Sequence, residues 1–147
     1  MAFDLRISEI FSGQSGSDLT ADWFEITNIG TTAWVQGVDA DLFYDDESED
    51  ATTADAITGL SAIAPGESVI VLVDSTDIAA FEAAWGDVRD LSNVQIGTID
   101  SAAGLGGGGD AVTLFADHAD DGVDAEDLID SAAYPDTEAN DGQTWDV

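Results

Sequence analysis

Carboxylates are the side chains of this sequence that could do chemistry, because they dominate its charged residues. The chain has 147 residues, of which 32 are Asp or Glu, two are Arg and one is His, so its formal net charge is −30. Acids are densest between residues 39 and 55 and between residues 117 and 127. Such loops supply the hard oxygen ligands that Ca²⁺ takes, about six to eight per ion. The candidate calcium ligands are Asp45, Asp46, Glu47 and Asp50 in the first cluster and Asp117, Asp120, Asp121 and Asp124 in the second.

Two interpretations of these clusters stay open. Neither cluster has the alternating acids of an EF-hand loop, since Asp120-Asp121-Gly122 lacks an Asp at alternate positions before it. The simpler interpretation is a solvated acidic surface whose charges repel one another. The alternative is at least one specific calcium site. No cofactor is expected to be required, and Ca²⁺ is the candidate ligand.

Catalytic groups of other kinds are scarce. Cys is absent, which excludes a thiol nucleophile, a disulfide framework and a zinc–thiolate site. His118 lies in the second acidic cluster with no Ser or Cys partner in a nucleophile motif, so we expect it to be exposed and inert. Paired carboxylates could act as acid and base, but no pattern marks one pair as buried. We therefore expect no catalytic residue and no enzymatic activity, and a hydrolase ranks third among the possible functions.

A glycine-rich run, GLGGGG, occupies residues 104–109 and precedes Asp110. A phosphate cradle needs a helix after such a run, whereas a strand pattern follows here. A calcium-binding nonapeptide repeat needs further copies, and the sequence has none. We expect a tight loop that leads into a strand.

Several aromatic and polar residues have a structural or a binding interpretation. Trp23 and Trp85 fall on core-facing patterns, whereas Trp34 and Trp145 are the candidates for an exposed pair that could stack on carbohydrate. Glu25 is expected to pair with one of the two arginines. Asn28 is expected to satisfy backbone donors of the turn that follows it.

The charge balance excludes several classes of partner. Nucleic acids and anionic lipids are recognised by Lys and Arg, and the chain has only Arg6 and Arg89. The longest dense apolar block, residues 69–73, is far shorter than the roughly 20 residues of a membrane span. The N-terminus lacks the basic and apolar segments of a secretory signal. We expect no nucleic acid and no membrane insertion, and the candidate partners are a protein or carbohydrate surface or further copies of the chain.

Short runs of alternating apolar and polar residues predict β-strands, with turn signals between them. One helix is predicted over residues 75–86, capped by Ser75 or Thr76 and ended by Gly86. Pro65-Gly66 predicts a turn, and the last residues, from Tyr134 to the end, are expected to be irregular. These elements predict one all-β domain over residues 1–147, an antiparallel β-sandwich. The predicted strands cover residues 3–10, 23–27, 34–35, 38–44, 68–74, 94–99, 111–116 and 128–134.

Five short motifs, in this order along the chain, carry a resemblance to a known family. They are ISEI at residues 7–10, DWFEITNIG at 22–30, IAPGESVIVL at 63–72, GGDAVTLF at 108–115 and IDSAAY at 129–134. Together they resemble the lamin tail domain, in its bacterial extracellular type. One segment departs from the family pattern, because VDADLFY at residues 38–44 places acids where small polar residues are usual.

The resemblance implies an immunoglobulin-like antiparallel β-sandwich with one short helix. It also implies a non-catalytic module for structure, adhesion or targeting, appended to a larger secreted protein. Such a module would act outside the cell or at its surface, and this one would be exported without an N-terminal signal peptide. The alternative function is an assembly subunit, such as a surface-layer, filament or capsid-decorating protein, because the chain begins with Met1.

Overall fold

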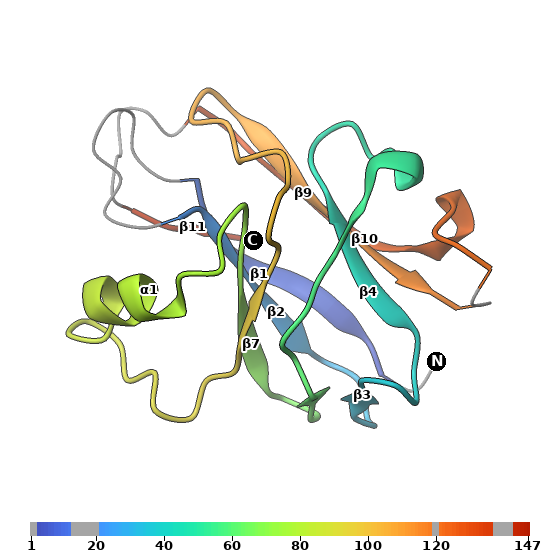
Figure 1. Ribbon diagram of the computed structural model, residues 1–147, viewed down its shortest axis with the longest axis horizontal. Coiled ribbons are helices and arrows are strands. Elements are labelled where there is room, and N and C mark those ends of the chain that lie inside the picture. The colour runs from blue at the N-terminus through green and yellow to red at the C-terminus, as the bar shows by residue number, and fades with distance from the viewer. Residues whose placement is uncertain (1–2, 13–20, 119–120, 137–142) are drawn as a thin grey trace.

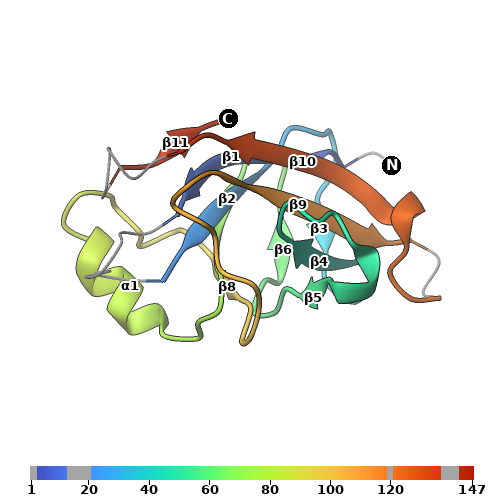
Figure 2. The same ribbon diagram turned by 90° about the horizontal axis from the view of Figure 1, so that it is seen from above.

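Two β-sheets packed face to face and one short α-helix make up the fold (Figures 1 and 2). The structure is a computed structural model that describes residues 3–12, 21–118, 121–136 and 143–147. No helix in these ranges has the length and apolar composition needed to cross a bilayer. The elements are β1 (Leu5–Phe11), β2 (Trp23–Asn28), β3 (Trp34–Val35), β4 (Asp41–Asp45), the 3-10 helix η1 (Ala51–Thr53), β5 (Asp55–Ala56), β6 (Ala62–Ile63), β7 (Ser68–Leu72), α1 (Ile78–Trp85), β8 (Ile96–Thr98), β9 (Asp110–Asp117), the 3-10 helix η2 (Ala125–Asp127), β10 (Leu128–Tyr134) and β11 (Trp145–Asp146).

The strand order confirms the predicted β-sandwich. One sheet has five strands in the order β11-β1-β2-β7-β8, the other has four in the order β10-β9-β4-β5, and β3 pairs with β6. Among the paired strands described, only β7 and β8 run parallel. The predicted antiparallel all-β sandwich with one short helix is therefore correct.

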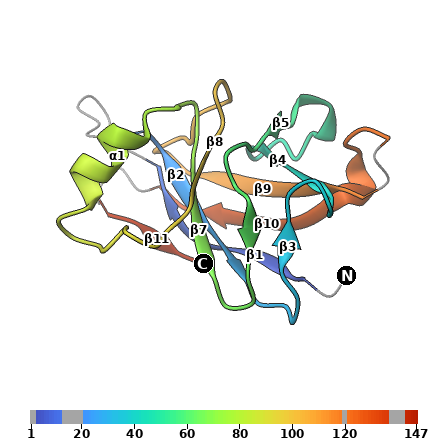
Figure 3. The same cartoon turned by 60° about the horizontal axis from the view of Figure 1, so that its bottom comes forward.

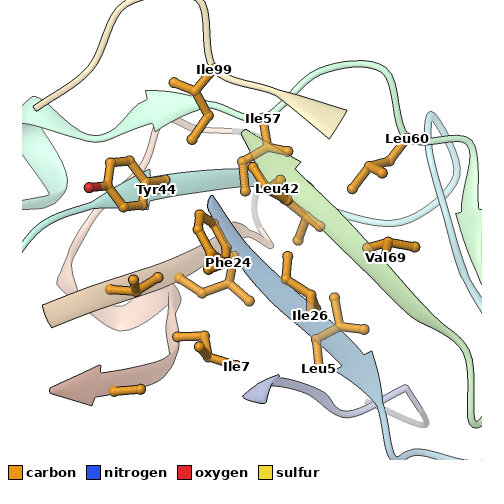
Figure 4. Close-up of a cluster of buried hydrophobic side chains, with 14 of the residues drawn as sticks. Leu5, Ile7, Phe24, Ile26, Leu42, Tyr44, Ile57, Leu60, Val69 and Ile99 are labelled. Carbon is orange, nitrogen blue, oxygen red and sulfur yellow. The ribbon is translucent and has the colours of Figure 1, made fainter. Parts of the chain in front are cut away.

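The main core fills the space between the two sheets. Phe24 of β2 and Tyr44 of β4 stack across it, with ring centroids 5.6 Å apart (Figure 4). A β-bulge between Ile7 and Glu9 changes the parity of β1, so that Ile10 faces this core and Glu9 does not. The first strand is thus apolar on its inner face despite its imperfect alternation.

A second apolar cluster lies on the outer face of the five-stranded sheet, under α1. Trp23 and Phe24 point to opposite faces, as predicted from the strand, but both are buried, with 2% and 0% of their surfaces exposed. Trp23 is covered by Phe81 and Trp85 of α1. In Figures 1 and 3, α1 lies beside the five-stranded sheet, away from β4 and β9.

The predicted start of the helix is wrong. The side chain of Asp77, rather than of Ser75 or Thr76, accepts a hydrogen bond from Ala80 N–H and caps α1. Ser75 instead forms an isolated β-bridge with Ile99, to whose carbonyl its N–H donates. Gly86 is the C-terminal cap, as predicted.

Two further expectations need correction. Trp34 is buried, with 1% of its surface exposed, because β3 pairs with β6 and the indole N–H donates to the Ala40 carbonyl at 2.8 Å. Trp34 therefore cannot form an exposed pair with Trp145, of which 42% is exposed. The C-terminal segment is not irregular throughout, because β11 extends the five-stranded sheet beside β1.

Candidate functional site

The calcium candidates of the two acidic clusters lie at opposite ends of the β4–β9 pair. Asp41, in the first cluster, is opposite Asp117 of the second, whereas the candidate Asp45 is opposite Thr113. Strands rise about 3.3 Å per residue, so Asp45 and Asp117 are separated by roughly 13 Å along the sheet. Within the described ranges, no three His, Cys, Asp or Glu side chains form a group that could hold a metal ion.

Carboxylates of the first cluster accept hydrogen bonds from their own loop. The buried Asp45 Oδ2 accepts from Ser48 Oγ at 2.6 Å and from Asp50 N at 2.7 Å. Asp50 caps η1, and its hydrogen bonds from Thr52 lower the pKa of its carboxyl. Glu47 lies beside Asp110, and this carboxyl contact raises its pKa. The remaining candidate, Asp46, accepts from Ser48 N at 2.9 Å.

Carboxylates of the second cluster also accept hydrogen bonds from their own loop. Asp117 Oδ2 accepts from Gly122 N at 3.3 Å, and Asp124 forms a reciprocal capping box with Asp127 at η2. Asp121 is exposed in the same loop, and Asp120 lies outside the described residues. Most of these described acids act as acceptors within their loops, but Asp117 Oδ1 is buried and no described residue hydrogen-bonds to it. The described calcium candidates do not form a group of three or more ligands.

Asp127, which the sequence did not single out as a ligand, is the buried acid of this second loop. Its Oδ1 accepts from the backbone N–H of His118 at 3.2 Å and lies 3.3 Å from the ring nitrogen Nδ1. Burial alone would raise the pKa of the Asp127 carboxyl, but the hydrogen bonds from His118 and Asp124 lower it overall. His118 is exposed, as predicted, and contacts this carboxylate.

The glycine-rich run is a tight loop that leads into β9, as predicted. Asp22 Oδ2 accepts from Leu105 N at 2.8 Å, and Asp110 Oδ2 accepts from Gly106 N at 2.7 Å. The Tyr134 hydroxyl donates to the Gly106 carbonyl at 2.9 Å, and burial raises its pKa, which keeps it protonated. The amides of Leu105 and Gly106 are therefore hydrogen-bonded within the protein.

The structure adds a pocket that the sequence did not predict, here called the α1 pocket. It has a volume of about 530 Å³ and lies between α1 with its following loop and the outer face of the five-stranded sheet. This volume is within the usual range of ligand pockets, about 300–1,000 Å³. Its described lining residues are Glu9, Trp23, Ile70, Phe81, Trp85, Val88, Arg89, Leu91, Gln143 and Thr144.

Aromatic rings form one wall of the α1 pocket. Trp85 meets Trp23 edge to face, with centroids 5.3 Å apart, and stacks obliquely on Phe81 at 6.4 Å. The indole N–H of Trp23 is buried, and no described residue accepts a hydrogen bond from it. Such an unsatisfied donor costs about 1–3 kcal/mol of stability.

The charged side chains Glu9 and Arg89 also line the α1 pocket. Arg89 Nη1 lies 3.0 Å from Glu9 Oε2, and Arg89 Nη2 lies 3.1 Å from Glu25 Oε2. The hydrogen bond that Arg89 donates to Glu9, together with the negative charges of Glu25 and Glu9, raises the pKa of the Arg89 guanidinium despite partial burial. The predicted pairing of Glu25 with an arginine is thus confirmed.

The signal that could have located these charged side chains is the rarity of arginine in the chain. Arg89 is one of two arginines in a chain with 32 acidic residues and follows the predicted helix by a few residues.

Asn28 also has its predicted structural role. Its Oδ1 accepts from Gly30 N at 2.9 Å, and its Nδ2 donates to the Ile63 carbonyl at 2.8 Å.

Comparison of the chain with models of known protein families, with curated proteins and with solved structures gives no match. The resemblance to lamin tail domains therefore stays a prediction from the motifs. The function must be argued from the geometry of the site.

Proposed function

We propose that this chain is a non-catalytic binding module that works outside the cell, in adhesion or targeting, as an accessory domain of a larger secreted protein. The α1 pocket is its ligand site. The resemblance to extracellular lamin tail domains supports the location and the module role, and the pocket supports binding.

The observation that carries the proposal is the composition of the α1 pocket. Ligand sites combine apolar and aromatic walls with a few polar groups that fix orientation. Here Trp85 and Phe81 line a pocket that is also lined by the charged side chains Arg89 and Glu9. Most described carboxylates of the two acidic loops accept hydrogen bonds that shape those loops, although Asp117 Oδ1 is buried and has no hydrogen-bond partner among the described residues.

An NMR screen tests the proposal. Indole N–H signals are resolved from backbone amides, so Trp23 and Trp85 report directly on the pocket. A panel of short peptides and neutral oligosaccharides is titrated into the native protein and into Val88→Trp, which fills the mouth of the pocket from an exposed position. Ile29→Trp makes a comparable change at an exposed residue outside the pocket.

We expect at least one ligand class to shift the Trp23 and Trp85 indole signals in the native protein and in Ile29→Trp, but not in Val88→Trp. Absence of any shift, or equal shifts in all three proteins, would show that the α1 pocket is not the binding site. Turnover of phosphoester, ester, glycoside or peptide substrates, lost on substitution of a single carboxylate, would instead establish an enzyme.

A further inference from the structure

Three carboxylates cross the outer face of the five-stranded sheet in one row. Asp146 of β11 is opposite Glu9 of β1, and Glu9 is opposite Glu25 of β2. Directly opposed residues of antiparallel strands carry their side chains on the same face, with Cβ atoms about 4.5–5.5 Å apart. This acidic row, Asp146, Glu9 and Glu25, ends at Ile70, which lines the α1 pocket.

The acidic row has too few counter-charges of its own. Like charges directly opposed in a sheet are destabilising. Arg89 bridges Glu9 and Glu25, which are mostly buried, with 17% and 11% of their side chains exposed. The other arginine, Arg6, pairs with Asp4 and Asp130, and the sequence has no Lys. One guanidinium for three carboxylates leaves the acidic row with a net charge of −2, and Glu9 of this row lines the α1 pocket.

We propose that the α1 pocket takes a basic side chain, arginine or lysine, from a segment of a partner protein. Its charged end pairs with Glu9 and Asp146, and its apolar stem packs against Trp85 and Leu91. This inference rests on the proposed binding function and specifies the class of ligand. Charge complementarity supports it at long range as well, because a net charge of −30 attracts cations and repels anions.

A neutral carbohydrate fits the pocket less well. Sugar rings stack on open aromatic faces, but Trp85 already contacts Phe11, Trp23 and Phe81, at centroid distances of 5.0, 5.3 and 6.4 Å. It is only partly exposed. A slender alkyl stem with a cationic end needs no open platform and can reach the acidic row from the pocket.

A pair of peptides tests this inference. The probe is acetyl-Gly-Leu-Arg-Leu-Gly-amide, and its control carries citrulline in place of arginine, which keeps the shape and removes the charge. Binding is followed by the indole N–H shifts of Trp23 and Trp85 at about 0.15 M NaCl, where the Debye length is about 8 Å and distant charges contribute little. We expect the citrulline peptide to bind about tenfold more weakly.

Matched variants separate the acidic row from the general negative field. Glu9→Gln and Asp146→Asn each remove one charge from the row, whereas Glu82→Gln removes one from an exposed position of α1 outside the lining. We expect about fivefold to tenfold weaker binding of the arginine peptide in the first two and native binding in the third. Asp146 is exposed, so its variant keeps the test valid if Glu9→Gln fails to fold.

Equal affinity for the two peptides, or equal loss of affinity in all three variants, would overturn the inference. If neutral oligosaccharides shift the indole signals and the arginine peptide does not, the pocket is a binding site for carbohydrate and only the ligand class is wrong. If no ligand shifts them, the proposed function itself fails.

Discussion

Arg89 and Glu25 join the loop after α1 to the middle of the five-stranded sheet, with Nη2 and Oε2 3.1 Å apart. Because Glu9 shares the same guanidinium, this contact neutralises part of a row of acids on the outer face of the sheet. Arg89 and Glu9 also line the α1 pocket. The rare arginine therefore has a structural role and defines the site.

Removal of the Arg89 guanidinium should destabilise the fold more than removal of the Arg6 guanidinium. Arg89→Met leaves Glu9 and Glu25 opposed without a counter-ion, and we expect a loss of about 1–3 kcal/mol in the free energy of unfolding. Arg6→Met breaks a pair with Asp4 in which both side chains are nearly half exposed, and we expect at most about 1 kcal/mol. Urea denaturation measures both, and a larger loss for Arg6→Met would refute the role assigned to Arg89.

Trp23→Ala and Phe24→Ala should both be strongly destabilising, at about 3–5 kcal/mol each. The reason is that neighbouring strand residues enter two different cores, Phe24 between the sheets and Trp23 under α1. Hydrogen exchange should separate them. We expect Trp23→Ala to raise exchange in α1 more than in β9, and Phe24→Ala to raise it in both. The same exchange pattern in the two variants would contradict the separation of the cores.

The pH dependence of stability should reveal Asp127. Its pKa in the folded protein lies below the ordinary value of 3.8, so its carboxylate stabilises the fold above that pH, and this contribution is lost as the pH falls through the folded pKa. Asp127→Asn should therefore differ most from the native protein near neutral pH and least near about pH 2. Thermal melting across this range measures the difference, with the exposed Asp121→Asn as control. If the difference in melting temperature between Asp127→Asn and the native protein is the same at every pH, the Asp127 carboxylate does not contribute pH-dependent stability.

Salt and calcium should act alike on the native protein. Mutual repulsion of the acids is screened by any salt, since the Debye length falls to about 3 Å at 1 M. The carboxylates of the acidic loops already accept hydrogen bonds from their own loops. We therefore expect millimolar CaCl₂ to leave the melting temperature in 1 M NaCl unchanged.

A specific calcium site would give a different result. It would stabilise by roughly 2.7 kcal/mol at 100 times its dissociation constant, even in high salt. A calcium-dependent rise that survives 1 M NaCl and disappears in Asp45→Asn/Asp46→Asn would establish the site in the first cluster. If the calcium-dependent rise disappears in Asp120→Asn/Asp121→Asn instead, the calcium site lies in the second cluster.

The sandwich could be predicted because most of its strands are long enough to show alternation. β2, β7, β9 and β10 each have five or more residues, and Gly86 marks the end of the only α-helix described. The two-residue strands β5, β6 and β11 carry no such signal and are not among the predicted strands, whereas β3 is. The burial of Trp34 in β3 depends on pairing with the distant β6, and β11 depends on its register with β1.

The candidate site was harder to predict, because it depends on register. The first acidic cluster is continuous in sequence, yet β4 carries Asp41 to one end of the sheet and Asp45 to the other. The bulge after Ile7 turns Glu9 to the outer face, where it meets Glu25 and Asp146. Neither the separation of Asp41 from Asp45 nor the outward orientation of Glu9 can be predicted from the spacing of acids along the chain.

Nuclear Overhauser effects between the arginine peptide and the protein locate the bound side chain most directly. If the α1 pocket binds a basic side chain, the peptide's arginine methylene protons will show cross-peaks to the ring protons of Trp85 and Phe81. Cross-peaks confined to residues 45–50 or 121–127 would place the peptide on the acidic loops and contradict the proposed site.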